Sequence, residues 1–214
     1  MPQPVKRRPY RSTVRAEQAE RTRARIIDAA RRSFLARGFS PTTIRSVAAA
    51  AEVAPETVYS VFRSKAGLLE AVVLAAVLRD DEPDDPLKRR WFHTVLRLPD
   101  ARAQLAALVR HTAETTALTS PIYAVMRAAG TEAPELEQLD RRLHRYRCAG
   151  QAKMVTKILE TSTLRPGLSL QEAATTFSML AGPELHHMLT ADHGWSQKRY
   201  VEWLDRTTAA ALLP

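Results

Sequence analysis

The stretch from Thr42 to Phe62 reads TTIRSVAAAAEVAPETVYSVF. Its first half places apolar residues on one helical face: Ile44, Val47, Ala48 and Ala51. Pro55 suits the first turn of a second helix, because the N–H that proline lacks would be unpaired there in any case. The stretch therefore predicts two short helices, one opened by Pro41 and Thr42 and one running from Pro55 to about Val61, with a tight turn between them.

The flanking sequence predicts one helix on each side of this pair. Upstream, apolar residues recur at helical spacing between Glu17 and Arg37, and Gly38 is a favourable C-terminal stop. Downstream, Ser64 can cap a fourth helix that runs from Lys65 to about Arg79. Three short helices within about 45 residues, the last two joined by a tight turn, form a helix-turn-helix candidate.

The helix that begins at Pro55 has the two faces that a DNA-reading helix needs. Residues suited to an inner, packed face are Ala48, Val53, Val58 and Phe62. Residues free to face outward are Thr57, Tyr59, Ser60 and Arg63. A short helix with such a polar outer face can enter the DNA major groove, which is about 12 Å wide.

The charge of the chain is concentrated at the same end. Residues 1–65 contain 14 Lys and Arg against 5 Asp and Glu, whereas residues 66–214 contain 18 of each, so the whole net charge of +9 lies in the first third. This asymmetry favours an acidic partner, either nucleic acid or an acidic membrane surface, and the alternative is a basic solvated tail. No apolar run approaches the roughly 20 residues of a membrane helix. Cys148 is the single cysteine, so no internal disulfide is expected. Because the basic N-terminal residues are not followed by the apolar stretch of a secretory signal either, we expect a soluble, cytoplasmic protein.

The remainder of the chain predicts a larger helical bundle, so the expected fold is all-α. Glycine is scarce, and the helix formers alanine, leucine and arginine dominate. An acidic loop with two prolines spans Asp80 to Pro86. The helices expected after it cover residues 88–96, 101–118, 121–129, 134–162, 170–180, 184–191 and 196–213.

Residues 23–69 resemble the DNA-binding domain of the TetR family of repressors. The positions at family spacing are Gly38-Phe39, Thr42-Thr43, Val53, Thr57, Tyr59, Phe62, Ser64-Lys65 and Leu68. Residues 1–16 contain Pro2, Pro4 and Pro9 among basic residues, and we expect them to form an irregular, flexible basic arm. The resemblance implies a helix-turn-helix domain (17–65) and a ligand-sensing, dimerising domain (66–214). It also implies a homodimer formed through the final two helices, a double-stranded DNA partner and a small-molecule effector.

The resemblance implies that Thr42, Thr43, Tyr59 and Lys65 contact phosphates. Together with the outward positions and the arm, the candidate DNA-binding residues are Thr42, Thr43, Arg45, Pro55, Glu56, Thr57, Tyr59, Ser60, Arg63, Lys65, Arg7, Arg8 and Arg11. The chain departs from the family at Ala54, Pro55 and Glu56, where a polar N-cap and a glycine are usual. Glu56 either reads a base, by accepting from a cytosine amino group, or packs within the protein. Arg45 either reaches DNA or is solvated, and the arm either enters a minor groove or attracts phosphates non-specifically.

The C-terminal part carries no nucleophile motif, glycine-rich phosphate loop or paired cysteines, so we expect neither an enzyme nor a cofactor. Aromatic and methionine residues on its central helices are candidates for a ligand pocket: Trp91, Phe92, His111, Tyr123, Met126, Met154 and Phe177. The alternative for each of them is an ordinary core position. A metal site near His186, His187 and His193 can be drawn, but surface histidines are the interpretation we prefer, and no metal is expected.

We therefore expect a ligand-responsive transcriptional regulator that binds a pseudo-palindromic operator as a homodimer. A repressor is our main hypothesis, although the sequence alone does not distinguish repression from activation. The alternative is an architectural DNA-binding protein without an effector. The two hypotheses differ in one structural respect, since an architectural protein needs no cavity in the C-terminal domain.

Overall fold

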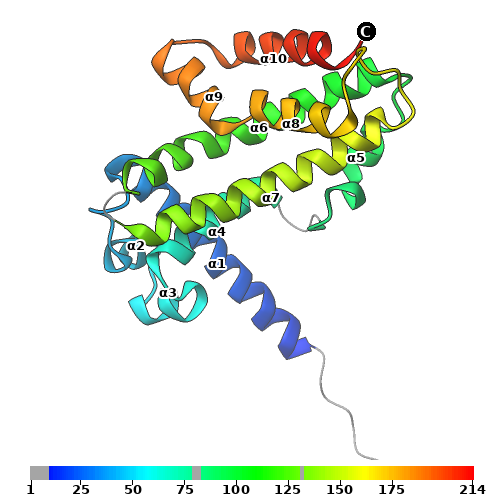
Figure 1. The fold of residues 1–214 in the computed structure, drawn as a ribbon. Helices are drawn as coiled ribbons and strands as arrows, with labels where there is room; N and C mark the ends of the chain where they lie inside the picture. Colours follow the sequence, from blue (N-terminus) through cyan, green and yellow to red (C-terminus); the bar gives the residue numbers. More distant parts are fainter. Residues whose placement is uncertain (1–9, 79–82, 131–132) are drawn as a thin grey trace, which may run out of the picture. The chain divides into compact units, whose positions relative to one another are not determined.

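The computed structural model describes residues 10–78, 83–130 and 133–214, together with their side chains except those of residues 10–14 and 78. Every regular element within these ranges is helical, so the predicted all-α fold is confirmed (Figure 1). The chain divides into two compact units, Met1–Val72 and Val73–Pro214. The expected boundary lay at residue 65, whereas the observed one falls within a helix, at Val72.

The first unit contains α1 (Tyr10–Arg37), α2 (Ile44–Ala50), α3 (Pro55–Phe62) and the beginning of α4 (Lys65–Leu78). Its core consists of side chains that are at most 8% exposed, among them Ile26, Ala30, Phe34, Phe39, Ile44, Val47, Ala48, Val58, Phe62, Leu68 and Leu69. The rings of Phe34 and Phe39 stack with centroids 5.8 Å apart, which secures the turn that follows α1. The three-helix arrangement expected from the sequence is present, with α2 packed against both α1 and α3.

The first helix begins earlier than predicted. The sequence indicated an irregular segment as far as residue 16, but α1 starts at Tyr10, directly after Pro9. Residues 10–16 contain neither glycine nor proline, so the sequence has no strong helix breaker there. The segment expected to be a flexible arm is therefore helical from Tyr10 onward, and residues 1–9 lie outside the described ranges.

The junction between α3 and α4 is sterically tight. Arg63 ends α3 in the left-handed region, with φ of 65°, and its N–H bonds Tyr59 O at 2.8 Å. The backbone of Gly67 then lies close to the last residue of α3, so that a Cβ added at Gly67 would lie only 2.3 Å from Phe62 O. Ser64 contributes its hydroxyl, which accepts from Gly67 N at 2.9 Å. Only glycine fits at position 67 with this backbone.

The second unit is a helical bundle. After the end of α4 it contains η1 (Pro86–Lys88), α5 (Arg90–Val95), α6 (Ala101–Ala128), α7 (Pro134–Leu159), α8 (Leu170–Leu180), α9 (Pro183–His187), the π-helical turn η2 (Met188–Asp192) and α10 (Gln197–Leu212). The long helix α6 packs against α7, α9 and α10, and α7 packs against α8. Its fully buried side chains include Phe92, Leu105, Leu108, Phe177, Tyr200 and Leu204.

One predicted break is absent. The sequence indicated that one helix ends at Leu118 and another begins at Pro121, yet α6 passes through Pro121 without interruption. A proline inside a helix removes one hydrogen bond and costs about 3 kcal/mol. Here the flanking side chains Ser120, Ile122 and Tyr123 are all at most 3% exposed. Burial of this face keeps the helix continuous.

A buried polar chain joins α6, α9 and α10. Ser120 Oγ lies 2.8 Å from His186 Nδ1, and His186 Nε2 lies 2.9 Å from Gln197 Oε1. The Gln197 amide donates to Ala113 O at 3.1 Å, so its oxygen accepts from His186 Nε2–H. Nδ1 therefore accepts from Ser120, which describes a neutral imidazole. The expectation of a surface histidine was wrong for His186, which is 5% exposed, and burial lowers its pKa below the usual value.

Candidate functional site

The outer face of α3 and its C-cap carries four of the thirteen predicted DNA-contacting residues. Glu56, Tyr59, Ser60 and Arg63 are exposed, and Tyr59 retains 53% of its accessible surface. Val58 and Phe62 are buried on the opposite face. The helix thus has the inner and outer faces predicted for it.

Two further α3 positions lie at the rim of this face. Pro55 occupies the first turn, as predicted, and Thr57 is half-buried. Ser60 Oγ donates to Thr57 O at 2.9 Å, which leaves its lone pairs free to accept from a base or water. Glu56 makes no hydrogen bond or ion pair with the described residues, so the structure gives no support to the alternative in which it packs internally.

At the start of α2, Thr43 and Thr42 behave differently. Thr43 is exposed and caps the helix by accepting from Ser46 N at 3.0 Å. Thr42 is fully buried, and its hydroxyl donates to Gly38 O at 2.8 Å, with Ser33 O at 3.2 Å. The structure therefore does not place Thr42 on the DNA-facing surface, since its side chain ties α2 to the end of α1.

Two further predicted residues, Lys65 on α4 and Arg45 on α2, are positively charged. The Lys65 ammonium donates to Phe39 O at 3.0 Å and to Ser40 O at 3.3 Å, and it lies 4.2 Å from the centroid of the Phe39 ring. Its role thus includes holding the turn after α1. Arg45 is exposed on α2. Arg11 belongs to α1, and Arg7 and Arg8 lie outside the described residues.

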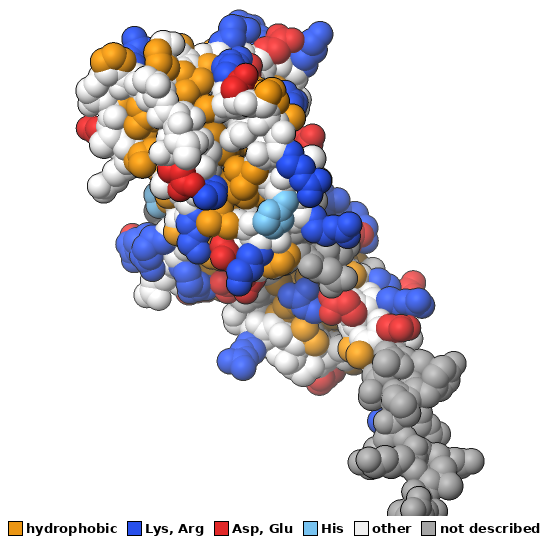
Figure 2. All heavy atoms as spheres, turned by 90° about the vertical axis from the view of Figure 1, so that its right-hand side faces the viewer, with side chains coloured by type: hydrophobic (Ala, Val, Ile, Leu, Met, Phe, Trp, Pro, Cys, Tyr) orange, Lys and Arg blue, Asp and Glu red, His pale blue; other side chains and the backbone are white. Residues whose placement is uncertain are grey.

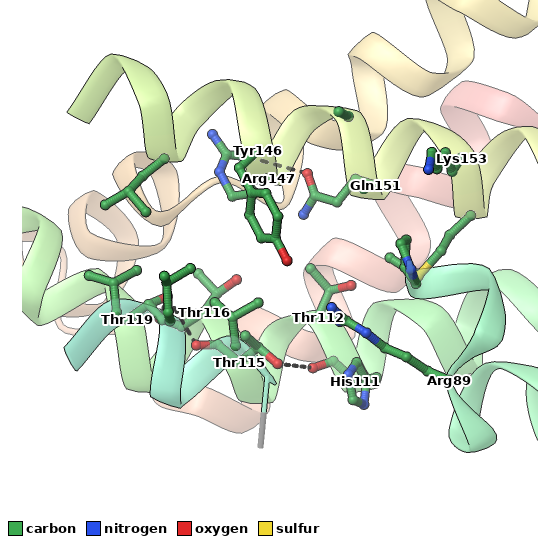
Figure 3. Close-up of a pocket in the computed structure, with 18 of the residues that line it drawn as sticks. Arg89, His111, Thr112, Thr115, Thr116, Thr119, Tyr146, Arg147, Gln151 and Lys153 are labelled. Atoms are coloured by element: carbon green, nitrogen blue, oxygen red, sulfur yellow. Dashed lines mark hydrogen bonds between the residues drawn. The ribbon is translucent and has the colours of Figure 1, made fainter. Parts of the chain in front are cut away.

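The second unit contains a cavity of about 230 Å³. It lies between α6 and α7 and is closed by η1, α5 and the end of α4 (Figure 3). Apolar side chains contributed by α4 and α7 include Val73, Val77, Leu143 and Met154. A concave and largely apolar space with a few polar groups is the usual form of a small-molecule site.

Four of the seven predicted pocket residues line this cavity: Trp91, His111, Tyr123 and Met154. The rings of Trp91 and His111 stack with centroids 3.5 Å apart, and burial raises the pKa of Tyr123 to about 12. The prediction was wrong for Phe92, Met126 and Phe177, which are at most 1% exposed and do not line the cavity. Phe92 and Phe177 belong to the apolar core of the second unit, the alternative that sequence spacing left open.

Comparison with known proteins identifies the family to which this chain belongs. Residues 26–72 match the model for bacterial regulatory proteins of the tetR family. A match of 146 residues is 34% identical to the HTH-type transcriptional regulator BetI of Burkholderia mallei and covers 63% of this chain and 70% of BetI. The chain belongs to the TetR family. It is accordingly a DNA-binding transcriptional regulator.

Other relatives of this TetR-family regulator match in part. SrpR of Pseudomonas putida, an HTH-type transcriptional regulator, is 38% identical over 89 residues, which are 40% of this chain and 42% of SrpR. The chain thus matches less than half the length of that relative.

Solved structures share the fold over nearly the whole chain. SmeT in complex with triclosan superposes with a TM-score of 0.66 at 21% identity and covers 90% of this chain and 92% of SmeT. FadR of Bacillus subtilis with stearoyl-CoA gives a TM-score of 0.60 at 16% identity, with 86% and 96% covered. A regulator from Saccharomonospora viridis with choline gives 0.63 at 19% identity, with 91% and 99% covered. At these identities the likeness concerns the fold.

The pocket of this TetR-family regulator is lined by polar residues that the sequence analysis did not select. They are Arg89, Thr115, Thr116, Thr119, Tyr146, Arg147, Gln151 and Lys153, together with Thr112. The signal was present, because residues 112, 115, 116 and 119 recur at i, i+3, i+4 and i+7 on one helical face. A row of threonines on an otherwise apolar helix face indicates that this face borders a cavity. The prediction was based on aromatic and methionine residues and therefore did not include these threonines.

Within the described ranges, no helix is both long and apolar enough to cross a lipid bilayer. Within the same ranges, no group of three or more His, Cys, Asp or Glu residues is arranged to hold a metal ion.

Proposed function

We propose that this protein is a ligand-responsive transcriptional repressor, which binds a pseudo-palindromic operator as a homodimer and is released by a small-molecule effector. The observation that carries the proposal is the presence of both sites in one chain: a polar, exposed α3 in the first unit and a cavity of about 230 Å³ in the second. The architectural alternative accounts for the first site and gives no reason for the second.

In this proposal α3 lies in the major groove and α2 contacts the phosphates. The proposed base-contacting residues are Glu56, Thr57, Ser60 and Arg63, with Pro55 fixing the start of the helix. The proposed phosphate-contacting residues are Thr43, Arg45, Tyr59 and Lys65, and Arg7, Arg8 and Arg11 supply further positive charge from the N-terminal segment. Thr42 is left out of this set, because its hydroxyl is buried and already bonded.

In the proposed homodimer, α8 and α10 form the interface, and the second protomer binds the second half-site of the operator. Met179 on α8 is 72% exposed, and Met188 after α9 is 43% exposed. Figure 2 shows exposed hydrophobic side chains interspersed with polar and charged ones on the face that it draws. Large exposed apolar residues on neighbouring helices are typical of an interface, and a two-fold dimer reads two half-sites one helical turn apart.

The helix α4 offers a route from effector to DNA. Its first half contributes Leu68 and Leu69 to the core of the first unit, and its second half contributes Val73 and Val77 to the wall of the cavity. A ligand that binds more tightly to the conformation unable to bind DNA would shift the population toward that conformation. Related folds hold triclosan, stearoyl-CoA and choline, which supports a small-molecule effector without identifying it. A reducing, cytoplasmic location accords with this function.

The test is the selection of bound sites from a random DNA library with the full chain. We expect enrichment of an inverted repeat, and a salt dependence of affinity that Arg45→Ala reduces by a slope of about 1 per protomer. The matched control is Arg145→Ala, an exposed arginine on α7. Weak enrichment of any sequence, with no effect of Glu56→Ala or Ser60→Ala on base preference, would favour the architectural alternative.

A further inference from the structure

We infer that the cavity takes a small organic anion, with an apolar body and one carboxylate or similar group held by Arg89. The inference rests on the proposed function in treating the cavity as the effector site, and it assigns the chemical class of the effector. The charge, burial and hydrogen bonding of the lining residues carry it.

Among the residues that the structure describes, Arg89 is a buried cation without a counterion. It is 6% exposed, its Nε donates to Pro83 O at 3.0 Å, and its Nη2 lies 3.5 Å from Asp84 O. Both partners are backbone carbonyls, and among the described residues no carboxylate lies within ion-pair distance of the guanidinium. Removing a charge from water is costly unless an opposite charge compensates it. A bound anion would supply that charge.

The other cations around the cavity already have acidic partners. Lys153 Nζ lies 3.5 Å from Asp85 Oδ1, and Arg147 Nη2 lies 3.8 Å from Glu184 Oε2. Arg147 also donates to Ser178 O at 2.9 Å. Asp84 is the one carboxylate among the lining residues, and it is exposed. The uncompensated charge of the lining is therefore concentrated at Arg89.

Of the four threonines in the α6 row that lines the cavity, only Thr112 has a hydroxyl that is able to donate to a ligand. Thr115 and Thr119 donate their hydroxyl protons to His111 O and Thr115 O, at 3.2 and 3.0 Å, and Thr116 donates to Ala181 O at 3.3 Å. These three therefore present lone pairs to a ligand. The Thr112 hydroxyl has no such bond among the described residues and remains able to donate. Figure 3 shows Thr112 as the threonine beside Arg89, with Tyr146 reaching into the same space from α7.

The cavity fixes the orientation and the size of the ligand. The threonine row from 112 to 119 rises about 10 Å along α6, from the Arg89 end toward Tyr123. The volume of about 230 Å³ is below the range of about 300 to 1,000 Å³ typical of drug-sized ligands. An acid of one ring and a short chain, or a short fatty acid, matches these dimensions. Its carboxylate lies at Arg89 and its apolar body extends toward Thr119.

The same geometry disfavours a quaternary ammonium ligand. Such cations are bound over free aromatic faces. One face of Trp91 is covered by His111, at 3.5 Å between ring centroids, and the buried charge nearest the cavity is positive. The specificity inferred here thus differs from that of the choline-bound structure of similar fold.

The test compares ligands of matched shape and different charge. The probes are benzoate, phenylacetate, 3-phenylpropionate and hexanoate, with the amide and the ammonium analogue of each, and choline. Binding to the full-length protein is measured by isothermal titration calorimetry. We expect at least one carboxylate to bind about tenfold or more tightly than its amide, and the ammonium compounds to bind more weakly still. Equal binding of acid and amide, tighter binding of an ammonium compound, or no binding of any acid overturns the inference.

Variants locate the anion within the cavity. Arg89→Gln, which can still donate to Pro83 O, should remove the tenfold preference for the acid, and the matched control Arg90→Gln alters an exposed neighbour and should preserve it. If Arg89→Gln does not fold, Arg89→Lys and Thr112→Val replace it: the first should retain the preference for the acid, and the second should reduce it. An unchanged preference in Thr112→Val and Arg89→Gln overturns the assignment.

The failure of this inference and the failure of the proposed function give different results. A neutral or cationic compound that binds in the cavity and releases the selected DNA would overturn the anion and leave the repressor intact. A carboxylate that binds with the expected preference, in a protein that selects no inverted repeat, would leave the anion site intact and overturn the repressor.

Discussion

Acidification should destabilise the second unit through His186. Burial and the neighbouring His187 lower the pKa of His186, whereas the hydrogen bond with Gln197 raises it less than burial lowers it. The unfolded chain therefore binds more protons than the native protein below about pH 6.5, and stability is lost as the pH falls from there toward the native pKa. If His186 stays neutral in the native protein, the loss between about pH 7.5 and about pH 5.5 is about 1.4 kcal/mol, which is an upper limit.

The measurement is urea unfolding, followed by far-ultraviolet circular dichroism at both pH values, for the wild type and for His186→Gln. Glutamine can still accept from Ser120 and donate to Gln197, but it does not titrate. Groups other than His186 contribute equally to both proteins, so the difference between the two pH dependences isolates this histidine. The control is His193→Gln, at an exposed position. If the wild type and His186→Gln lose the same free energy on acidification, the interpretation of a buried neutral imidazole is refuted.

Three further predictions concern packing and surface charge. Gly67→Ala should cost about 1 to 3 kcal/mol in thermal unfolding, because its Cβ would meet Phe62 O at 2.3 Å, whereas Gly150→Ala, with 3.8 Å to Pro86 Cγ, should not destabilise. Asp205→Asn should lower the free energy of unfolding by at most about 1 kcal/mol near neutral pH, because the hydrogen bond from Arg102 lowers the pKa of Asp205. The difference in unfolding free energy from wild type should vanish as the pH falls through that pKa. Thr42→Val should cost about 1 to 3 kcal/mol and leave the salt slope of DNA binding unchanged, so a reduced slope would return Thr42 to the DNA-contacting set.

The helices of the first unit could be predicted because local signals coincide there. Pro55 marks the start of α3, Gly38 follows the end of α1, and the apolar face of α2 has a regular period. Pro121 shows the opposite case. A proline breaks an isolated helix, but burial of both neighbouring turns outweighs the loss of one hydrogen bond. That outcome depends on tertiary packing, which local sequence does not contain.

The pocket could be predicted only in part, for a related reason. Trp91 and Phe92 are consecutive aromatics on one short helix, so one faces the cavity and the other faces the core. Periodicity identifies two faces of a helix but does not say which of them borders a cavity. Arg89 was passed over because an arginine is normally exposed, and its burial follows from carbonyl groups that the fold brings to it.

The contact at Gly67 restricts how the DNA preference of this protein can change over evolutionary time. With no room for a Cβ over Phe62 O, the end of α3 keeps a fixed distance from the first turn of α4. Substitutions at this junction cannot tilt the reading helix gradually, because the first step is already a steric clash. New operators must therefore be acquired by exchanging the outward side chains, such as Glu56, Ser60 and Arg63, on an unchanged backbone. A recombinant library that varies these positions and keeps Gly67 should yield altered specificities without loss of folding.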